Sequence, residues 1–263
     1  MRTLKIGIVL SVISAATLVA VGGPDNPYHS KEKSDIAALV DKEVAAIKAD
    51  SDTTDDKKKA KHLAKIGQLL LEEPKGAPLA LGVFEEALSY DSSNAEANFF
   101  AAILGPIQTL KGFPFKLKKI AGAVEMEKAI EEVLAGIGNK DTQNLVSDLL
   151  QGADPRDIFR LPSDVQKYLV AQLLPVLKKS EERLSIVEET EHFRVSFNYK
   201  NWQNSWHLRK SVSFDEVEVH ALRVALKGIS TEVKLISSYN VDAGMALRDQ
   251  FRNRRHLTMK EVI

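Results

Sequence analysis

The stretch from Phe84 to Phe100, FEEALSYDSSNAEANFF, combines two helical patterns with a short polar turn. On both sides of the turn, alanine and phenylalanine recur every three or four positions, which is the spacing of one face of an α-helix. Between them, Asp91, Ser92 and Asn94 are residues that favour turns. The stretch therefore predicts two consecutive helices joined by a tight connection.

The surrounding segment, 60–104, resembles a tetratricopeptide repeat, a helix–turn–helix unit of about 34 residues. The residues that lie at its packing positions are Leu63, Ile66, Gly67, Leu70, Ala80, Phe84 and Ala87. Leucine replaces both aromatics of the first motif, Ser92 stands where the family has proline, and the turn before Ala80 is one residue longer. No second full repeat follows, because Gly105 and Pro106 are expected to interrupt the next helix. A generic helical hairpin with the same spacing is the alternative.

The resemblance implies both a packing scheme and a mode of binding. In this family a small residue, here Gly67, lets the two helices of a repeat approach closely. Stacked repeats bury one face on their neighbours and leave a concave groove. In the family that groove commonly holds a peptide or a partner protein, so we expect a protein or peptide partner here.

Helical spacing recurs elsewhere in the chain. An acidic and then lysine-rich segment after residue 49 is interpreted as a loop and a helix start, with Thr54 or Asp55 as N-cap. Further helices are predicted over 34–49, 115–135, 141–150 and 163–189. Pro175 is expected to kink or break the last of these.

After Thr190 the apolar period changes from 3.6 residues to two. Two alternating runs within 192–213 predict a β-hairpin with one apolar face. Because an isolated hairpin is marginally stable in water, this face is expected to pack on a helix. The next segment, 214–238, begins with a capping-box match at Ser213–Glu216 and is apolar around most of its circumference. This pattern predicts a central, buried helix under the hairpin.

The N-terminal segment has the composition of a secretory signal peptide. Arg2 and Lys5 form a short basic start, which precedes an apolar run and then small residues. This order is typical of an export signal. We assign 1–22 to the signal peptide, with an uncleaved inner-membrane anchor as the alternative, and 23–33 to a polar linker.

Charge and cysteine content exclude several classes. The 36 Lys plus Arg equal the 36 Asp plus Glu, so net charge indicates neither a nucleic acid nor a membrane partner. The absence of cysteine excludes disulfides, thiolate metal sites and a cysteine nucleophile. The chain's end is basic, but nucleic-acid binding would need aromatic interleaving or a known fold, and export makes it less favoured still, so we expect none; peripheral contact with anionic lipid or an acidic protein is the alternative. Its basic residues are Arg248, Arg252, Arg254, Arg255, His256 and Lys260.

Catalytic motifs are missing from the sequence. It contains no HExxH, no GxSxG and no phosphate-binding GxxxxGK[ST]. His192 and His207 fall on the polar face of the predicted hairpin, and two ligands make only a weak metal site. We therefore predict no metal, no cofactor and no enzymatic activity, with a hydrolase of unrecognised site as an alternative.

Together these features predict a mainly α-helical exported protein, periplasmic or secreted. A tetratricopeptide-like helical region covers 34–160, and a second helical region, 161–263, carries the β-hairpin. The predicted function is non-catalytic binding or scaffolding through the helical groove. A periplasmic carrier is the alternative, in which helix 214–238, the hairpin and the pair Phe113 and Phe115 enclose an apolar small molecule or lipid.

Overall fold

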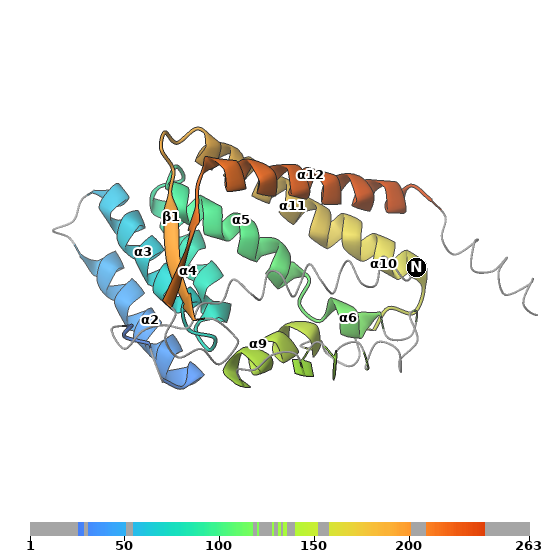
Figure 1. Cartoon of the computed structure of the whole chain (residues 1–263), viewed down its shortest axis with the longest axis horizontal. Coiled ribbons are helices and arrows are strands. Elements are labelled where there is room, and N and C mark those ends of the chain that lie inside the picture. The colour runs from blue at the N-terminus through green and yellow to red at the C-terminus, as the bar shows by residue number, and fades with distance from the viewer. Residues whose placement is uncertain are drawn as a thin grey trace, which may run out of the picture.

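A computed structural model shows a mainly helical protein with one two-stranded antiparallel sheet (Figure 1). This confirms the predicted helical class and the small β-hairpin. The structure describes residues 26–28, 31–50, 55–117, 120, 128, 131–132, 134–135, 140–151, 158–200 and 209–239. The signal segment 1–22 and the basic chain end lie outside the described residues.

The helices follow one another along the chain with short connections in the first half. They are α2 (Lys33–Ala49), α3 (Asp56–Leu71), α4 (Ala77–Tyr90), α5 (Ala95–Thr109), α6 (Phe113–Lys116), α9 (Lys140–Gln151), α10 (Pro162–Tyr168), the π-helical η1 (Leu169–Leu173), α11 (Leu174–Glu188) and α12 (Glu216–Ser237). The strands β1 (Val195–Lys200) and β2 (Arg209–Phe214) lie between α11 and α12. The long helix predicted over 115–135 falls mostly outside the described residues.

Six of the helices form a single packed series. Each contacts the next in the order α2, α3, α4, α5, α11, α12. In the segment between α5 and α11, α6 packs against α9, and α10 packs against η1 and α12 (Figure 1). The two predicted regions therefore share one hydrophobic core, since Leu184 and Val219 belong to the same buried cluster as Leu63 and Phe100.

The turn that opens the sequence analysis is held by its own side chains. Asp91 accepts hydrogen bonds from the backbone N–H and the hydroxyl of Ser93, at 3.0 and 2.6 Å. Asn94 caps α5 by accepting from the N–H of Ala97 at 2.9 Å. The buried amide of Asn98 donates back to the carbonyls of Ser92 and Asn94, at 2.8 and 3.1 Å. These bonds satisfy backbone groups that a helix end leaves unpaired, so α4 and α5 are joined tightly.

The central helix is α5, which packs against α3, α4 and α11, whereas the sequence predicted segment 214–238 for this position. All residues from Ala97 to Ala102 are buried. The Phe100 ring stacks on Phe84 at 5.1 Å between centroids, and Phe99 meets Phe193 at 5.4 Å and Phe214 at 5.2 Å. The hairpin therefore packs its base on α5 through Phe99, rather than on a central α12.

The helix α5 also continues through Gly105 and Pro106 to Thr109, so the predicted interruption is wrong. The hydroxyl of Thr109 donates to the carbonyl of Gly105 at 2.9 Å, within the last turn. Packing of α5 against α11 favours the continuation: a Cβ at Gly105 would lie 3.3 Å from Val176.

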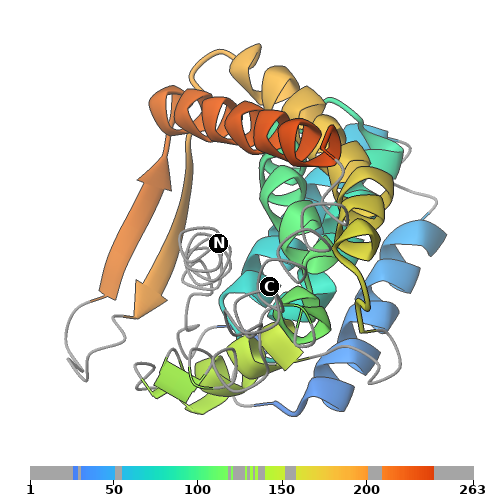
Figure 2. The same cartoon turned by 90° about the vertical axis from the view of Figure 1, so that its right-hand side faces the viewer.

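In the hairpin, β1 and β2 pair antiparallel, with Val195 opposite Phe214 and Lys200 opposite Arg209. The hydroxyls of Ser196 and Ser213 lie 2.7 Å apart on its outer face. The hairpin stands on the opposite side of the helical body from α2 (Figure 2). Residues 201–208, which include His207, lie outside the described part of the chain.

A capping box begins α12 two residues later than predicted. Asp215, not Ser213, accepts from the N–H of Val217 at 2.8 Å, and Glu218 accepts from the N–H of Asp215 at 2.9 Å. Ser213 remains in β2, because its pairing with Ser196 keeps the backbone extended. The sequence correctly predicted a capped start for this helix but placed the capping residue two positions too early.

Pro175 lies within a helical segment but does not end it. A π-helical turn, η1, precedes it, and the N–H of Leu174 bonds to the carbonyl of Leu169, five residues back. Because proline has no N–H and its ring crowds the preceding turn, a locally widened turn accommodates it. The helix then resumes as α11.

Within the predicted linker 23–33, Asn26 and Tyr28 are buried against the helical body. Tyr28 is fully buried, and its hydroxyl donates to Glu43 at 2.6 Å. Its N–H donates to the side chain of Asn26 at 2.9 Å, whose amide donates to the carbonyl of Leu69 at 2.8 Å. Burial, together with the bond to Glu43, raises the pKa of Tyr28 well above its usual value.

We expect Gly67→Ala to destabilise the protein, because the added Cβ would lie 2.6 Å from the Phe84 ring. Overpacking of this kind costs about 1–3 kcal/mol of unfolding free energy. Gly82→Ala is the matched control, since a Cβ there meets nothing within 4 Å and glycine is a poor helix former. Urea unfolding should show a loss for the first variant and a gain of about 0.5–1 kcal/mol for the second. Equal effects would contradict the close approach of α3 and α4.

We expect Tyr28 to make stability sensitive to alkaline pH. The folded state keeps the phenol proton to higher pH than the unfolded chain, where tyrosine ionises near pH ~10. The contribution of Tyr28 is therefore complete below pH ~10 and is lost as pH rises above it. Tyr28→Phe cannot ionise, so its unfolding free energy should fall less steeply than that of the wild type between about pH 9 and 11. Parallel curves in urea unfolding would contradict this assignment.

Candidate interaction surface

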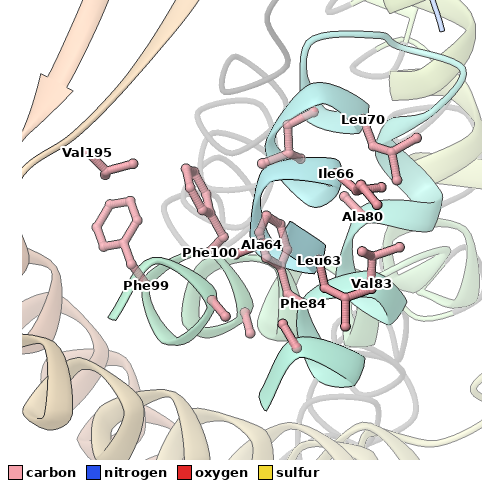
Figure 3. Packing of buried hydrophobic residues seen from close by; sticks show 14 of the residues in the cluster. Leu63, Ala64, Ile66, Leu70, Ala80, Val83, Phe84, Phe99, Phe100 and Val195 are labelled. Atoms are coloured by element: carbon pink, nitrogen blue, oxygen red, sulfur yellow. The ribbon is translucent and has the colours of Figure 1, made fainter. Parts of the chain in front are cut away.

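The residues that carry the repeat resemblance build the core and do not form a binding surface. Leu63, Ile66, Leu70, Ala80, Phe84 and Ala87 are all buried in one cluster. In Figure 3 the labelled residues of α3 and α4 pack against one another, and Phe99 faces Val195 of β1. Gly67 is also buried, against the Phe84 ring. Because the residues from Ala97 to Ala102 are likewise buried, this part of α5 leaves no open groove beside the α3–α4 pair.

The exposed apolar surface lies on α12 instead. Among the described residues, seven large apolar side chains are exposed, and five of them are on α12 or the turn that follows it. These five are Val217, Val224, Ile229, Leu235 and Tyr239. Scattered exposed apolar residues need no explanation, but a concentration on one element marks an interaction surface.

The two faces of α12 have different environments. Its inner face contains the buried residues Val219, Ser230 and Val233. Since successive residues are rotated by about 100°, Val217 and Val224 lie on the opposite side of the helix. They are 73% and 57% exposed. The prediction of an all-round buried helix was therefore wrong: both faces are apolar, but only one has a partner among the described residues.

The outward-facing residues follow a regular spacing. Steps of four, three, four, three and four residues connect the members of what we call the outer stripe: Val217, Ala221, Val224, Gly228, Thr231 and Leu235. This alternation has the period of 3.5 residues that brings side chains to the seam of two packed helices. A Cβ added at Gly228 would meet no atom within 4 Å, so the stripe is open at its middle.

Charged residues flank the outer stripe in an ordered way. Along one edge lie Lys227 and Lys234, and along the other lie Glu218 and Glu232; all four are exposed. The helix therefore has an apolar seam with a basic border on one side and an acidic border on the other.

Polar contacts on the inner side hold α12 in place on α11. Glu188 pairs with Arg223 and lies 3.1 Å from the Nδ1 of His220. Further along, the hydroxyl of Ser230 donates to Glu181 at 2.7 Å. Since Glu188 meets the start of α12 and Glu181 its middle, the two helices run antiparallel, and the outer stripe is presented on a fixed support.

The C-terminal end of α12 is fixed by α10. The side-chain amide of Gln166 donates to the carbonyls of Ile236 and Tyr239, at 2.7 and 2.6 Å. Such bonds replace the partners that the last turn of a helix lacks. Beneath this end, Val233 joins a second apolar cluster in which the rings of Phe113, Phe159 and Tyr168 pack together.

The opposite end of the helix series has a different surface. The inner face of α2 buries Ile36, Val40 and Ile47, and its outer face carries Ser34, Ala38, Asp41, Lys42 and Ala45. Terminal units of helical arrays require a polar outer face to stay soluble. The outer face of α2 has this character, and the outer stripe of α12 does not.

Neither a metal site nor a membrane span is found in the described part of the chain. There, no group of three His, Asp or Glu residues is placed to hold a metal ion. No helix among the described ranges combines the length and the apolarity needed to cross a bilayer. The backbone N–H of His192, one of the two histidines considered for a metal, donates to the Glu216 carboxylate at 3.0 Å.

These observations argue against part of the carrier hypothesis. It placed the apolar residues of 214–238 around an enclosed ligand, but Val217, Val224 and Leu235 face outward. Phe113 is buried in the second apolar cluster, against other aromatic rings.

Sequence reasoning missed the outer stripe, although the signal was present. Apolar residues around most of a helix indicate burial. Because the inner face of α12 is apolar as well, the 3.5-residue spacing of Val217, Val224 and Leu235 did not stand out in the sequence.

Comparison of the chain with protein-family models, with curated proteins and with solved structures gives no match.

We expect serine substitutions to distinguish the two faces of α12. Val219→Ser removes a fully buried side chain and should cost about 2–4 kcal/mol of unfolding free energy. Val224→Ser, at an exposed position on the same helix, should change it by less than about 0.5 kcal/mol in dilute solution. Thermal or urea unfolding at low protein concentration measures both, and similar losses would contradict the assignment of faces.

Proposed function

We propose that this protein is an exported, non-catalytic scaffolding protein that binds a protein partner through the outer stripe of α12. The observation that carries the proposal is the unmatched apolar face at one end of a helical series whose other end is polar. Water contact with these side chains is unfavourable by roughly 25 cal/mol per Å² of apolar area, so covering them favours association. Export is inferred from the composition of residues 1–22.

The partner surface that fits best is another α-helix. The outer stripe is narrow and straight and extends along a helix of 22 residues, about 33 Å long. Its 3.5-residue spacing matches the seam by which helices pack side by side. Recognition through helical anchors at such spacing is a common mode of peptide and protein binding.

Within this proposal the α3–α4 pair is a tetratricopeptide-like unit with a structural role. Its matching positions stabilise the body, and Gly67 allows the close approach to Phe84. The binding surface then differs from the family's concave groove: it is the outer face of the last described helix. Fold likeness alone does not choose a function, so the proposal depends on the surface and not on the resemblance.

Because the chain has no cysteine, a single introduced thiol reports on one position without background. We expect Ala221→Cys, on the outer stripe, to react freely with a maleimide in dilute purified protein and to be protected in the native cell envelope. Ala38→Cys, on the outer face of α2, is the matched control and should react equally in both settings. The intact mass of the envelope protein should also lack residues 1–22.

Equal reactivity of the two thiols in the envelope would show that the outer stripe has no partner there and would overturn the proposed docking surface. A full-length mass would support the alternative of an uncleaved anchor.

A further inference from the structure

We propose that the partner is a second copy of this chain, and that two α12 helices pack side by side, parallel and in register. This inference rests on the proposed docking function of the outer stripe. It would make the protein a two-fold symmetric dimer joined along α12.

Self-association is favoured because the outer stripe is complementary to itself and not to the outer face of α2. In a head-to-tail contact, the outer stripe would meet the outer face of α2, which carries Asp41 and Lys42. That contact would bury charged groups against Val217 and Val224, at a cost in desolvation. In a two-fold contact the same surface meets itself, so apolar residues face apolar residues. Among the described ends of the helical series, only the outer stripe is complementary to itself in this way.

The charged borders select the orientation of the pair. When one helix is turned by 180° about an axis parallel to its own, its acidic border comes to face the basic border of the other. Lys227 on one copy then meets Glu232 on the other, twice across the seam, as residues five positions apart do in parallel coiled coils. An antiparallel pair would instead place lysines beside lysines and glutamates beside glutamates. Neither Lys227 nor Glu232 forms an ion pair with another described residue, so both are free to bridge.

Small residues allow the two backbones to come close. In the parallel register Ala221 faces Ala221 of the partner and Gly228 faces Gly228. A Cβ at Gly228 meets nothing within 4 Å in one copy, so a second helix can approach there. Leu235 pairs with Leu235 of the partner at the C-terminal end of the seam. Val217 and Val224 pair with their own counterparts in the layers that alternate with those of Ala221 and Gly228.

The support behind α12 is compatible with this pairing. The buried residues Val219 and Val233 lie on the side of the helix opposite the outer stripe, so the body of each copy extends away from the seam. Glu188 and Gln166 already hold α12 as a formed helix. Association therefore does not have to order it, which reduces the cost of binding. A seam of about three heptads is small for a protein–protein interface, so we expect a weak dimer that dissociates on dilution.

The first test measures mass in solution and the register of the pair. We expect light scattering to show a dimer at about 100 µM and a monomer at about 1 µM, by mass action. Under mild oxidation Ala221→Cys should form a disulfide-linked dimer, because parallel pairing brings the two Cβ atoms to the roughly 4 Å that a disulfide needs. Ala225→Cys, on the acidic border, is the matched control and should not. A disulfide formed only on mixing Ala221→Cys with Thr231→Cys would mean antiparallel pairing and would overturn the proposal.

The second test uses charge reversal on the surface, where folding is not at risk. Lys227→Glu and Glu232→Lys should each weaken dimerisation by roughly tenfold, because two ion pairs become two repulsions. The double variant should return close to the wild-type dissociation constant. No recovery in the double variant would contradict the pairing of these two residues.

Val224→Asp separates the two proposals. It should keep the protein monomeric at about 100 µM with unchanged thermal stability of the monomer. If the wild type is itself monomeric while the thiol at position 221 is protected in the envelope, the dimer is excluded and the docking function stands with another occupant. Binding of a monomeric wild type to anionic vesicles, lost in Val224→Asp, would identify that occupant as a membrane surface. If neither dimer nor protection is found, both proposals fail.

Discussion

The burial of α5 on all sides is the constraint on which the rest of the structure depends. Its two adjacent phenylalanines point to different partners: Phe100 stacks on Phe84 of α4, and Phe99 packs against Phe193 and Phe214 at the base of the hairpin. Alanines on the same helix allow α4 and α11 to approach. One short helix thus joins the N-terminal helices to elements that lie about a hundred residues later in the chain, and it fixes where α11 and α12 can sit.

Polar contacts extend this order to the end of the helical series. Glu85 of α4 pairs with the buried Arg183 of α11 at 2.5 Å, and Glu188 of α11 pairs with Arg223 of α12. Arg183 is buried, and a buried charge whose partner is removed is strongly unfavourable, so its pair with Glu85 disfavours other alignments of α4 and α11. The result is a rigid support that ends in an outward apolar face on α12. This arrangement is why we propose binding at that face rather than at the α3–α4 pair.

The sequence predicted what depends on local spacing and failed where the answer depends on tertiary partners. The helix over 34–49, the turn at 91–94 and the period-two hairpin are properties of short segments, and they were found nearly as predicted. The central helix was misplaced, because composition does not show which face of an apolar helix has a neighbour, and Gly105 and Pro106 were expected to interrupt α5. The burial of Tyr28 in a polar segment likewise depends on Glu43 and on the carbonyl of Leu69. The outer stripe became interpretable only once the inner face of α12 was known.

Native-state hydrogen exchange at increasing denaturant tests the central role of α5 most directly. If α5 joins the two parts of the chain, the slowest amides of α4, α5 and α11 should exchange with the same free energy and the same denaturant dependence, as one cooperative unit. Two separate isotherms, one for the helices up to α5 and another for α11 and α12, would show that the two parts unfold independently. That result would contradict the single shared core and, with it, the fixed presentation of the outer stripe.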